Sequence, residues 1–166
     1  MANRRRPIPK RIWFTEEEWH LVEAKMVEAE MLAGMAFNNA NLGYVHAMAH
    51  QLGGLYDMPH GVANAVLLPH VARYNLIANP EKFADIAEFM GENTDGLSTM
   101  DAAELAIHAI ARLSADIGIP QHLRDLGVKE ADFPYMAEMA LKDGNAFSNP
   151  RKGNEKEIAE IFRQAF

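Results

Sequence analysis

The sequence predicts an all-α fold, a bundle of helices that follows a short basic arm of extended or strand-like backbone. Three observations support this prediction. Apolar residues recur at helical spacing along most of the chain. Glycines and prolines separate these stretches, at places where helices begin or end. Runs rich in β-branched and aromatic residues, which would indicate strands, are almost absent after residue 15.

The helices can be placed from their end signals. Thr15 and Glu18 have the spacing of a capping box, so the first helix is expected from about Glu16. Small residues crowd positions 33–52, where we expect helices that pack closely in the middle of the bundle. The pair Gly53-Gly54 predicts a turn. Further helices are predicted over residues 61–75, 81–90, 98–117, 130–142 and 154–165.

The beginning of the chain is basic and contains prolines. Within the first eleven positions stand Arg4, Arg5, Arg6, Lys10 and Arg11, together with Pro7 and Pro9. Proline favours an extended arm, and the bulky residues 11–14 suit a short strand. A basic cluster of this kind can bind phosphates, but a short charged terminus can also simply be solvated.

Composition excludes several classes of protein. The chain is 49% hydrophobic and 23% charged, as in ordinary globular proteins, and its net charge of −7 argues against a general nucleic-acid coat. It contains no cysteine, which excludes disulfides, cysteine-based metal sites and thiol nucleophiles. There is no apolar run of membrane-spanning length and no secretory signal, so we expect a cytoplasmic protein without a membrane partner.

Three histidines carry the candidate chemistry. His46 and His50 are four residues apart, which places both imidazoles on one face of a helix. His60 stands at the head of the next predicted helix. Imidazole is a good ligand for iron and zinc, and ligands from neighbouring elements can meet at one ion. From spacing alone, a metal site and a polar pocket of hydrogen-bonded histidines both remain open.

The other histidines carry less information. His70 follows a proline in an apolar helix, and we expect its role to be structural. His108 and His122 fit no pattern and are expected to be surface or packing residues. His20 has the spacing of a paired ligand with Glu16.

Longer motifs surround the three central histidines. They read NNANLGYVHAMAHQLGG at 38–54, PHGVANAVLLPHV at 59–71, GIP at 118–120, LRDLGV at 123–128 and NPR at 149–151. With this spacing, residues 31–166 resemble the C-terminal helical domain of the iron-containing (group III) alcohol dehydrogenases. The resemblance implies a helical bundle like that domain.

The resemblance also implies roles for the histidines. In this family the metal lies in a cleft between an N-terminal nucleotide-binding domain and the helical domain, where one aspartate and three histidines bind it. His46 and His60 match the last two histidine ligands. His50 matches a histidine beside the nicotinamide that is not a ligand and helps to move the alcohol proton, so it is the candidate catalytic residue. Iron, or zinc in its place, would act as a Lewis acid while hydride passes to the cofactor.

The sequence departs from the family pattern in two respects. The family's first two ligands, an aspartate and a histidine four residues apart, have no counterpart here, and the surroundings of Glu16 and His20 do not resemble that helix. The glycine-rich phosphate-binding turn is also absent. We therefore expect residual divalent-metal binding at His46 and His60, no NAD(P) binding, and no alcohol oxidation by this chain alone.

Upstream of residue 26 the sequence has a different character. A basic strand-like segment, a Thr-Glu-Glu-Glu cap and a helix follow one another. In this order residues 4–26 resemble the start of ribbon-helix-helix proteins, in particular the small DNA-binding accessory proteins of plasmid mobilisation. Such proteins dimerise through the strand and lay it in the major groove of DNA. The resemblance implies an alternative function, a dimeric DNA-binding or interaction protein that uses residues 4–14.

These two resemblances divide the chain into a segment of foreign origin at 1–26 and a dehydrogenase-like domain at 27–166. The simpler alternative is that residues 1–30 cap the exposed side of the bundle. A cleft-facing apolar surface without its partner domain favours self-association, so we expect a homodimer or a larger assembly.

Overall fold

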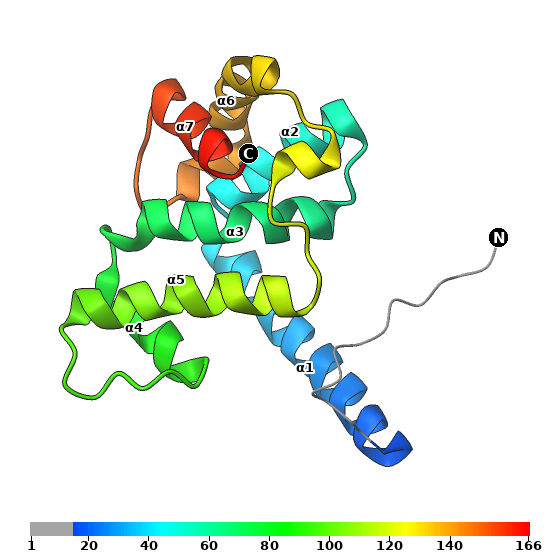
Figure 1. Ribbon diagram of the computed structural model, residues 1–166, viewed down its shortest axis with the longest axis vertical. Coiled ribbons are helices and arrows are strands. Elements are labelled where there is room, and N and C mark those ends of the chain that lie inside the picture. Colours follow the sequence, from blue (N-terminus) through cyan, green and yellow to red (C-terminus); the bar gives the residue numbers. More distant parts are fainter. Residues whose placement is uncertain (1–14) are drawn as a thin grey trace. The chain divides into compact units, whose positions relative to one another are not determined.

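The computed structural model describes residues 15–166, apart from the side chains of residues 16–18. The described residues contain no strand and form seven α-helices and three short 3-10 helices (Figure 1). The α-helices are α1 (Glu16–Ala40), α2 (Tyr44–Tyr56), α3 (His60–Leu76), α4 (Pro80–Phe89), α5 (Thr99–Asp116), α6 (Phe133–Lys142) and α7 (Glu155–Gln164). The 3-10 helices are η1 (Leu123–Leu126), η2 (Glu130–Asp132) and η3 (Gly144–Ser148). The all-α prediction is confirmed.

The chain divides into two compact units, residues 1–41 and 42–166. In the first unit the structure describes helix α1, which is 25 residues long and is rich in alanine, glutamate and methionine, all good helix formers. An ion pair joins Lys25 and Glu28 at 2.8 Å along the helix surface. Asn41, with a φ of 61°, lies in the left-handed region directly after the helix.

In the second unit, α3 lies between two groups of helices (Figure 1). Its residues Leu67 and Val71 belong to the larger core cluster, to which α2, α6 and α7 also contribute. Phe133 and Phe162 stack within this cluster at 5.7 Å between ring centroids. A smaller cluster joins the last turn of α3 to α4 and α5, with Leu76 2% exposed. Helix α3 is therefore the element that the two cores of this unit share.

The predicted helices from residue 61 onward are confirmed to within one residue at each end, except that α6 begins at Phe133, where the prediction began at residue 130 and the structure has the 3-10 helix η2. The predicted turn at Gly53-Gly54 is wrong. Both glycines lie within α2, which continues to Tyr56 and ends at Asp57 in the left-handed conformation, with a φ of 49°. A helical glycine costs about 1 kcal/mol relative to alanine. Leu52 in the same turn is fully buried, and this burial outweighs the local preference.

Some predictions cannot be followed in the structure. The strand-like residues 11–14 and the basic arm lie outside the described residues. The boundary between residues 26 and 27 stays a prediction. No helix among the described residues has the length and apolar character needed to cross a membrane.

Asn149 ties together segments that are far apart in the sequence. It is 3% exposed and lies between η3 and α7. Its Oδ1 accepts hydrogen bonds from the backbone N–H of Tyr44 at 3.0 Å and from Nδ2 of Asn75 at 3.1 Å. Its Nδ2 donates to Oδ1 of Asn75 and to the carbonyl of Arg151, both at 2.7 Å. A Cβ atom on Gly43 would lie 2.8 Å from Oδ1 of Asn149, so the glycine makes this approach feasible.

Replacing Asn149 tests this arrangement. Asn149→Ala leaves the Tyr44 N–H and the Asn75 amide without partners in the interior, and we expect the free energy of unfolding to fall by about 2–4 kcal/mol. Urea denaturation followed by circular dichroism measures the change. Asn93→Ala is the matched control, because Asn93 is exposed and bonds only to the N–H of Asp95. Equal stability of the Asn149→Ala and Asn93→Ala proteins would contradict the role of Asn149.

Candidate metal-binding site

The structure brings His46, His50 and His60 together. His46 and His50 lie one turn apart on α2, and His60 is the first residue of α3. The ring centroids of His46 and His60 are 5.4 Å apart and the rings are tilted by 51°. His50 and His60 are 5.5 Å apart and stacked, with 24° between their planes.

Local folding explains this placement. Asp57 ends α2 in the left-handed conformation, and its N–H donates to the carbonyl of Gly53. Pro59 then forms the N-cap of α3. Only residues 57–59 connect the two helices. Ala47 and Ala63 are fully buried members of the core cluster that α2 and α3 share. These small side chains let the two helices approach closely at the end that carries the histidines.

Asp143 is a site residue that the sequence did not reveal. It precedes η3 and lies 93 positions from His50, whose Nδ1 is 2.7 Å from Asp143 Oδ2. Because an ionised carboxylate can only accept, the Nδ1–H of His50 donates this bond. The other oxygen, Oδ1, accepts hydrogen bonds from the backbone N–H of Asn145 at 2.8 Å and from its Nδ2 at 2.9 Å. Only Nε2 of His50 is then left to exchange a proton.

The pKa values of two site residues are shifted. Burial raises the pKa of Asp143, but the hydrogen bonds from His50 and Asn145 outweigh burial, and the net pKa lies below its usual value. Burial lowers the pKa of His46, and the neighbouring His60 and His50 lower it further when charged, while Asp143 opposes them. His46 is therefore a neutral imidazole near neutral pH, which is the form that binds metals.

The donor set fits half of a metal site. With metal–nitrogen bonds of about 2.0–2.1 Å, two imidazoles on one tetrahedral ion have ring centroids about 5–5.5 Å apart. The separation of His46 and His60 matches this value. His50 is stacked on His60 and hydrogen-bonded to Asp143, so it lies beside His46 and His60 but is not assigned as a ligand. Within residues 15–166 no group of three or more ligating side chains lies close enough together to hold an ion.

Asn64 adds an acceptor one turn after His60 on α3. Its Oδ1 is buried and has no hydrogen-bond partner among the described residues. A buried carbonyl oxygen without a partner costs about 1–3 kcal/mol. Asn64 is thus an unsatisfied acceptor in the same helix as a candidate ligand.

The remaining predicted site residues lie elsewhere. His20 is on α1, in the other compact unit, with its Nδ1 3.5 Å from Oε2 of Glu23. The side chain of Glu16 is outside the described part of the chain, as are residues 4–14. The DNA-binding alternative therefore stays a prediction.

Comparison with known protein families identifies the family of this chain. The sequence profile described as "Fe-containing alcohol dehydrogenase family, C-terminal" matches residues 15–166, and the chain belongs to this family. The resemblance seen in residues 31–166 is thereby confirmed.

Particular relatives are very similar to the chain. It is 97% identical over 141 residues to 1,3-propanediol dehydrogenase of Citrobacter freundii, covering 85% of this chain and 36% of that protein. It is 90% identical over 141 residues to 1,3-propanediol dehydrogenase of Klebsiella pneumoniae, with the same two coverages of 85% and 36%. A crystal structure of 1,3-propanediol oxidoreductase superposes with a TM-score of 0.83 at 90% identity, over 83% of this chain and 36% of that one. The chain thus spans 36% of the length of each of these proteins.

The pairing of His50 with Asp143 predicts a pH-dependent stability. Because the folded-state pKa of Asp143 lies below its unfolded value, its stabilising contribution is present above an unfolded pKa of about 3.9 and is lost as the pH falls through the folded pKa. The side chain of His50 is 44% exposed, so we expect Asp143→Asn to cost only about 0.5–1 kcal/mol near neutral pH. Urea denaturation at a series of pH values should show this difference vanish in acid.

A double-mutant cycle with His50→Gln separates the pair from other effects. If the pair is the source of the stability, the double variant should be no less stable than the weaker single variant. Additive losses at neutral pH would contradict it.

Proposed function

We propose that this chain supplies half of the metal site of an iron-containing alcohol dehydrogenase and, as an isolated polypeptide, binds a divalent ion without oxidising alcohols. The supporting observation is the separation of 5.4 Å between the rings of His46 and His60, with no third ligand beside them among the described residues. Membership of an Fe-containing family makes iron the natural ion, with zinc as a substitute.

The three histidines and Asp143 would have different roles in the reaction. His46 and His60 would hold the ion, which when bound supplies Lewis-acid polarisation of the alcohol oxygen. His50 would accept or return the alcohol proton at Nε2. Asp143 keeps the proton of His50 on Nδ1 through its hydrogen bond of 2.7 Å, so that Nε2 is free for this exchange.

The substrate class follows from the relatives. Two proteins at least 90% identical to this chain are 1,3-propanediol dehydrogenases, so a small diol and its aldehyde are the proposed reactants of a whole enzyme built with this domain. A nicotinamide cofactor would have to be bound by residues beyond the matched part, since the glycine-rich turn is absent from these 166 residues. The absence of this turn supports the proposal that the isolated chain does not oxidise alcohols.

Anaerobic titration of metal-free protein with Fe(II) and with Zn(II) tests the half-site. We expect saturable binding of about one ion per chain, with an affinity below that of sites with three or more ligands, because only two imidazoles contribute. His46→Ala/His60→Ala should abolish it. His50→Ala is the matched control, since it removes a neighbouring imidazole that is not a proposed ligand. Unchanged binding in the His46→Ala/His60→Ala protein would contradict the assignment.

An activity assay completes this test. Iron-loaded chain is mixed with NADH and a small aldehyde, beside full-length 1,3-propanediol dehydrogenase as the positive control. The proposal expects no NADH oxidation above the metal-only blank. Oxidation that is lost in His60→Ala would show that the chain is an enzyme by itself.

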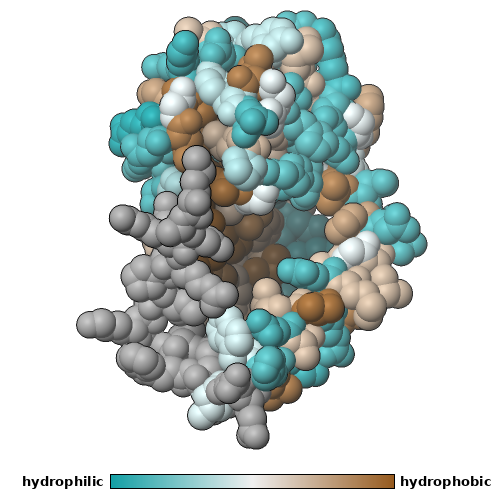
Figure 2. Space-filling model, turned by 90° about the vertical axis from the view of Figure 1, so that its right-hand side faces the viewer, coloured by the Kyte–Doolittle hydropathy of each residue, from teal (hydrophilic) through white to brown (hydrophobic). Residues whose placement is uncertain are grey.

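We also propose that the chain forms a homo-oligomer. Eight large apolar side chains on α1 are at least 39% exposed, namely Trp19, Leu21, Met26, Val27, Met31, Leu32, Met35 and Phe37. In Figure 2, hydrophobic residues also reach the surface at several places between hydrophilic ones. Exposed apolar side chains in this number favour association, and a second copy of α1 presents the same apolar side chains.

Light scattering over a dilution series tests this proposal. We expect a mass above that of the monomer, and a lower mass in Met31→Glu/Met35→Glu, because two charges in an apolar interface are costly to desolvate. Lys25→Ala, on the exposed surface of the same helix, is the matched control. A monodisperse monomer at every concentration would contradict self-association.

A further inference from the structure

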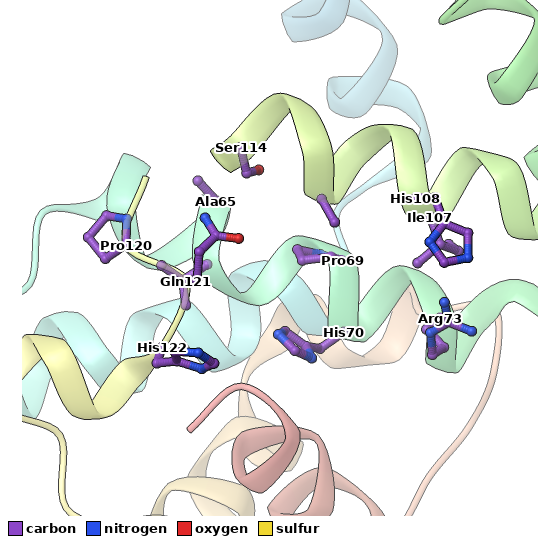
Figure 3. A pocket seen from close by; sticks show the side chains of 12 residues that line it. Ala65, Pro69, His70, Arg73, Ile107, His108, Ser114, Pro120, Gln121 and His122 are labelled. Carbon is purple, nitrogen blue, oxygen red and sulfur yellow. The ribbon is translucent and has the colours of Figure 1, made fainter. Parts of the chain in front are cut away.

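A pocket separate from the candidate metal site lies between α3, α5 and the segment that precedes η1. Its volume is about 270 Å³, close to the lower end of the range for small-molecule sites, which is about 300–1,000 Å³. None of the three histidines of the candidate metal site lines it. Figure 3 shows side chains from all three segments lining this space.

The lining has a definite chemical character. Half of its twelve residues are alanine, valine, isoleucine or proline. The other half can all donate hydrogen bonds, namely His70, Arg73, His108, Ser114, Gln121 and His122. No carboxylate lines the pocket. A cavity with an apolar body, polar side chains that can all donate and no carboxylate in its lining matches a small organic anion.

The charges around the pocket decide which side chains hold an anion. Arg73 is paired with Glu104 of α5 at 2.6 Å, and Glu157 and Glu160 of α7 line a neighbouring pocket with it. The guanidinium charge is therefore largely compensated, although its other N–H groups remain available as donors. The histidines must supply the rest of the attraction. His108 on α5 and His122 in the connection are exposed at the rim, whereas His70 is half-buried on α3.

We infer that this pocket binds a small organic carboxylate, with its apolar body against the proline and alanine surface and its carboxylate beside His70 and His122 (Figure 3). Burial lowers the pKa of His70, and positive charge on His122 and Arg73 lowers it further. A bound anion reverses the effect of those charges, so binding takes up a proton on His70. The affinity therefore rises as the pH falls.

Calorimetric titration of the full chain with sodium butyrate tests this inference. We expect binding of about one butyrate per chain that is several-fold tighter at about pH 6 than at about pH 7.5. His122→Ala and His70→Gln should each weaken binding about tenfold, while His20→Gln, on α1, leaves it unchanged. The signal of His70 in the NMR spectrum should titrate at a higher pH when butyrate is present.

Two further compounds test which parts of butyrate the pocket recognises. Butyramide, which has the same shape without the charge, should not bind. Inorganic phosphate should bind more weakly than butyrate, because it does not use the apolar surface. The inference is overturned if butyrate does not bind, if butyramide or phosphate binds as well as butyrate, or if both pocket variants keep the affinity of the wild type.

Discussion

The arrangement of the second unit depends on one buried amide, the side chain of Asn149. It fixes where α2 begins, through the N–H of Tyr44, and where α3 ends, through the amide of Asn75. Holding the start of one helix beside the end of the other limits their positions, and the side chains packed between them, such as Ala47 and Ala63, set how they cross. His46 and His60 meet at 5.4 Å because they are attached to those two helices. The candidate metal site therefore rests on a hydrogen-bonded asparagine at the opposite end of α3.

The helices were predictable because their end signals are local. Ser98 caps α5 by accepting from the N–H of Asp101, and Asn154 and Glu157 form a complete capping box at the start of α7. Pro80 opens α4, as a proline does at the first position of a helix. The exception was the glycine pair within α2, where the burial of a neighbouring leucine overrides the local preference for a turn. Local signals give element boundaries, and they fail where tertiary packing holds a weak helix former in place.

The site was predictable only in part, for the same reason. The four-residue spacing of His46 and His50 placed both on one face of a helix, and the position of His60 at the head of the next helix made an approach of the three rings possible, but their distances depend on how α2 and α3 pack. Asp143 could not be found this way, because 93 residues separate it from His50 and only the packing of the whole unit joins them. His108 and His122 showed no pattern, and His70 was expected to be structural, because the three come from separate segments of the fold. Their common pocket exists only once α3 and α5 are packed.

The geometry also separates two kinds of histidine chemistry within one short stretch of chain. A histidine that exchanges protons needs one nitrogen held by a partner, and a ligand needs a neutral imidazole with a free nitrogen. His50 has the first arrangement through Asp143, whereas burial and its neighbours keep His46 in the second. Both depend on contacts inside residues 42–166 alone, since α2, α3 and η3 all belong to that unit. The helical unit therefore holds the imidazoles of the proposed half-site in position through its own contacts.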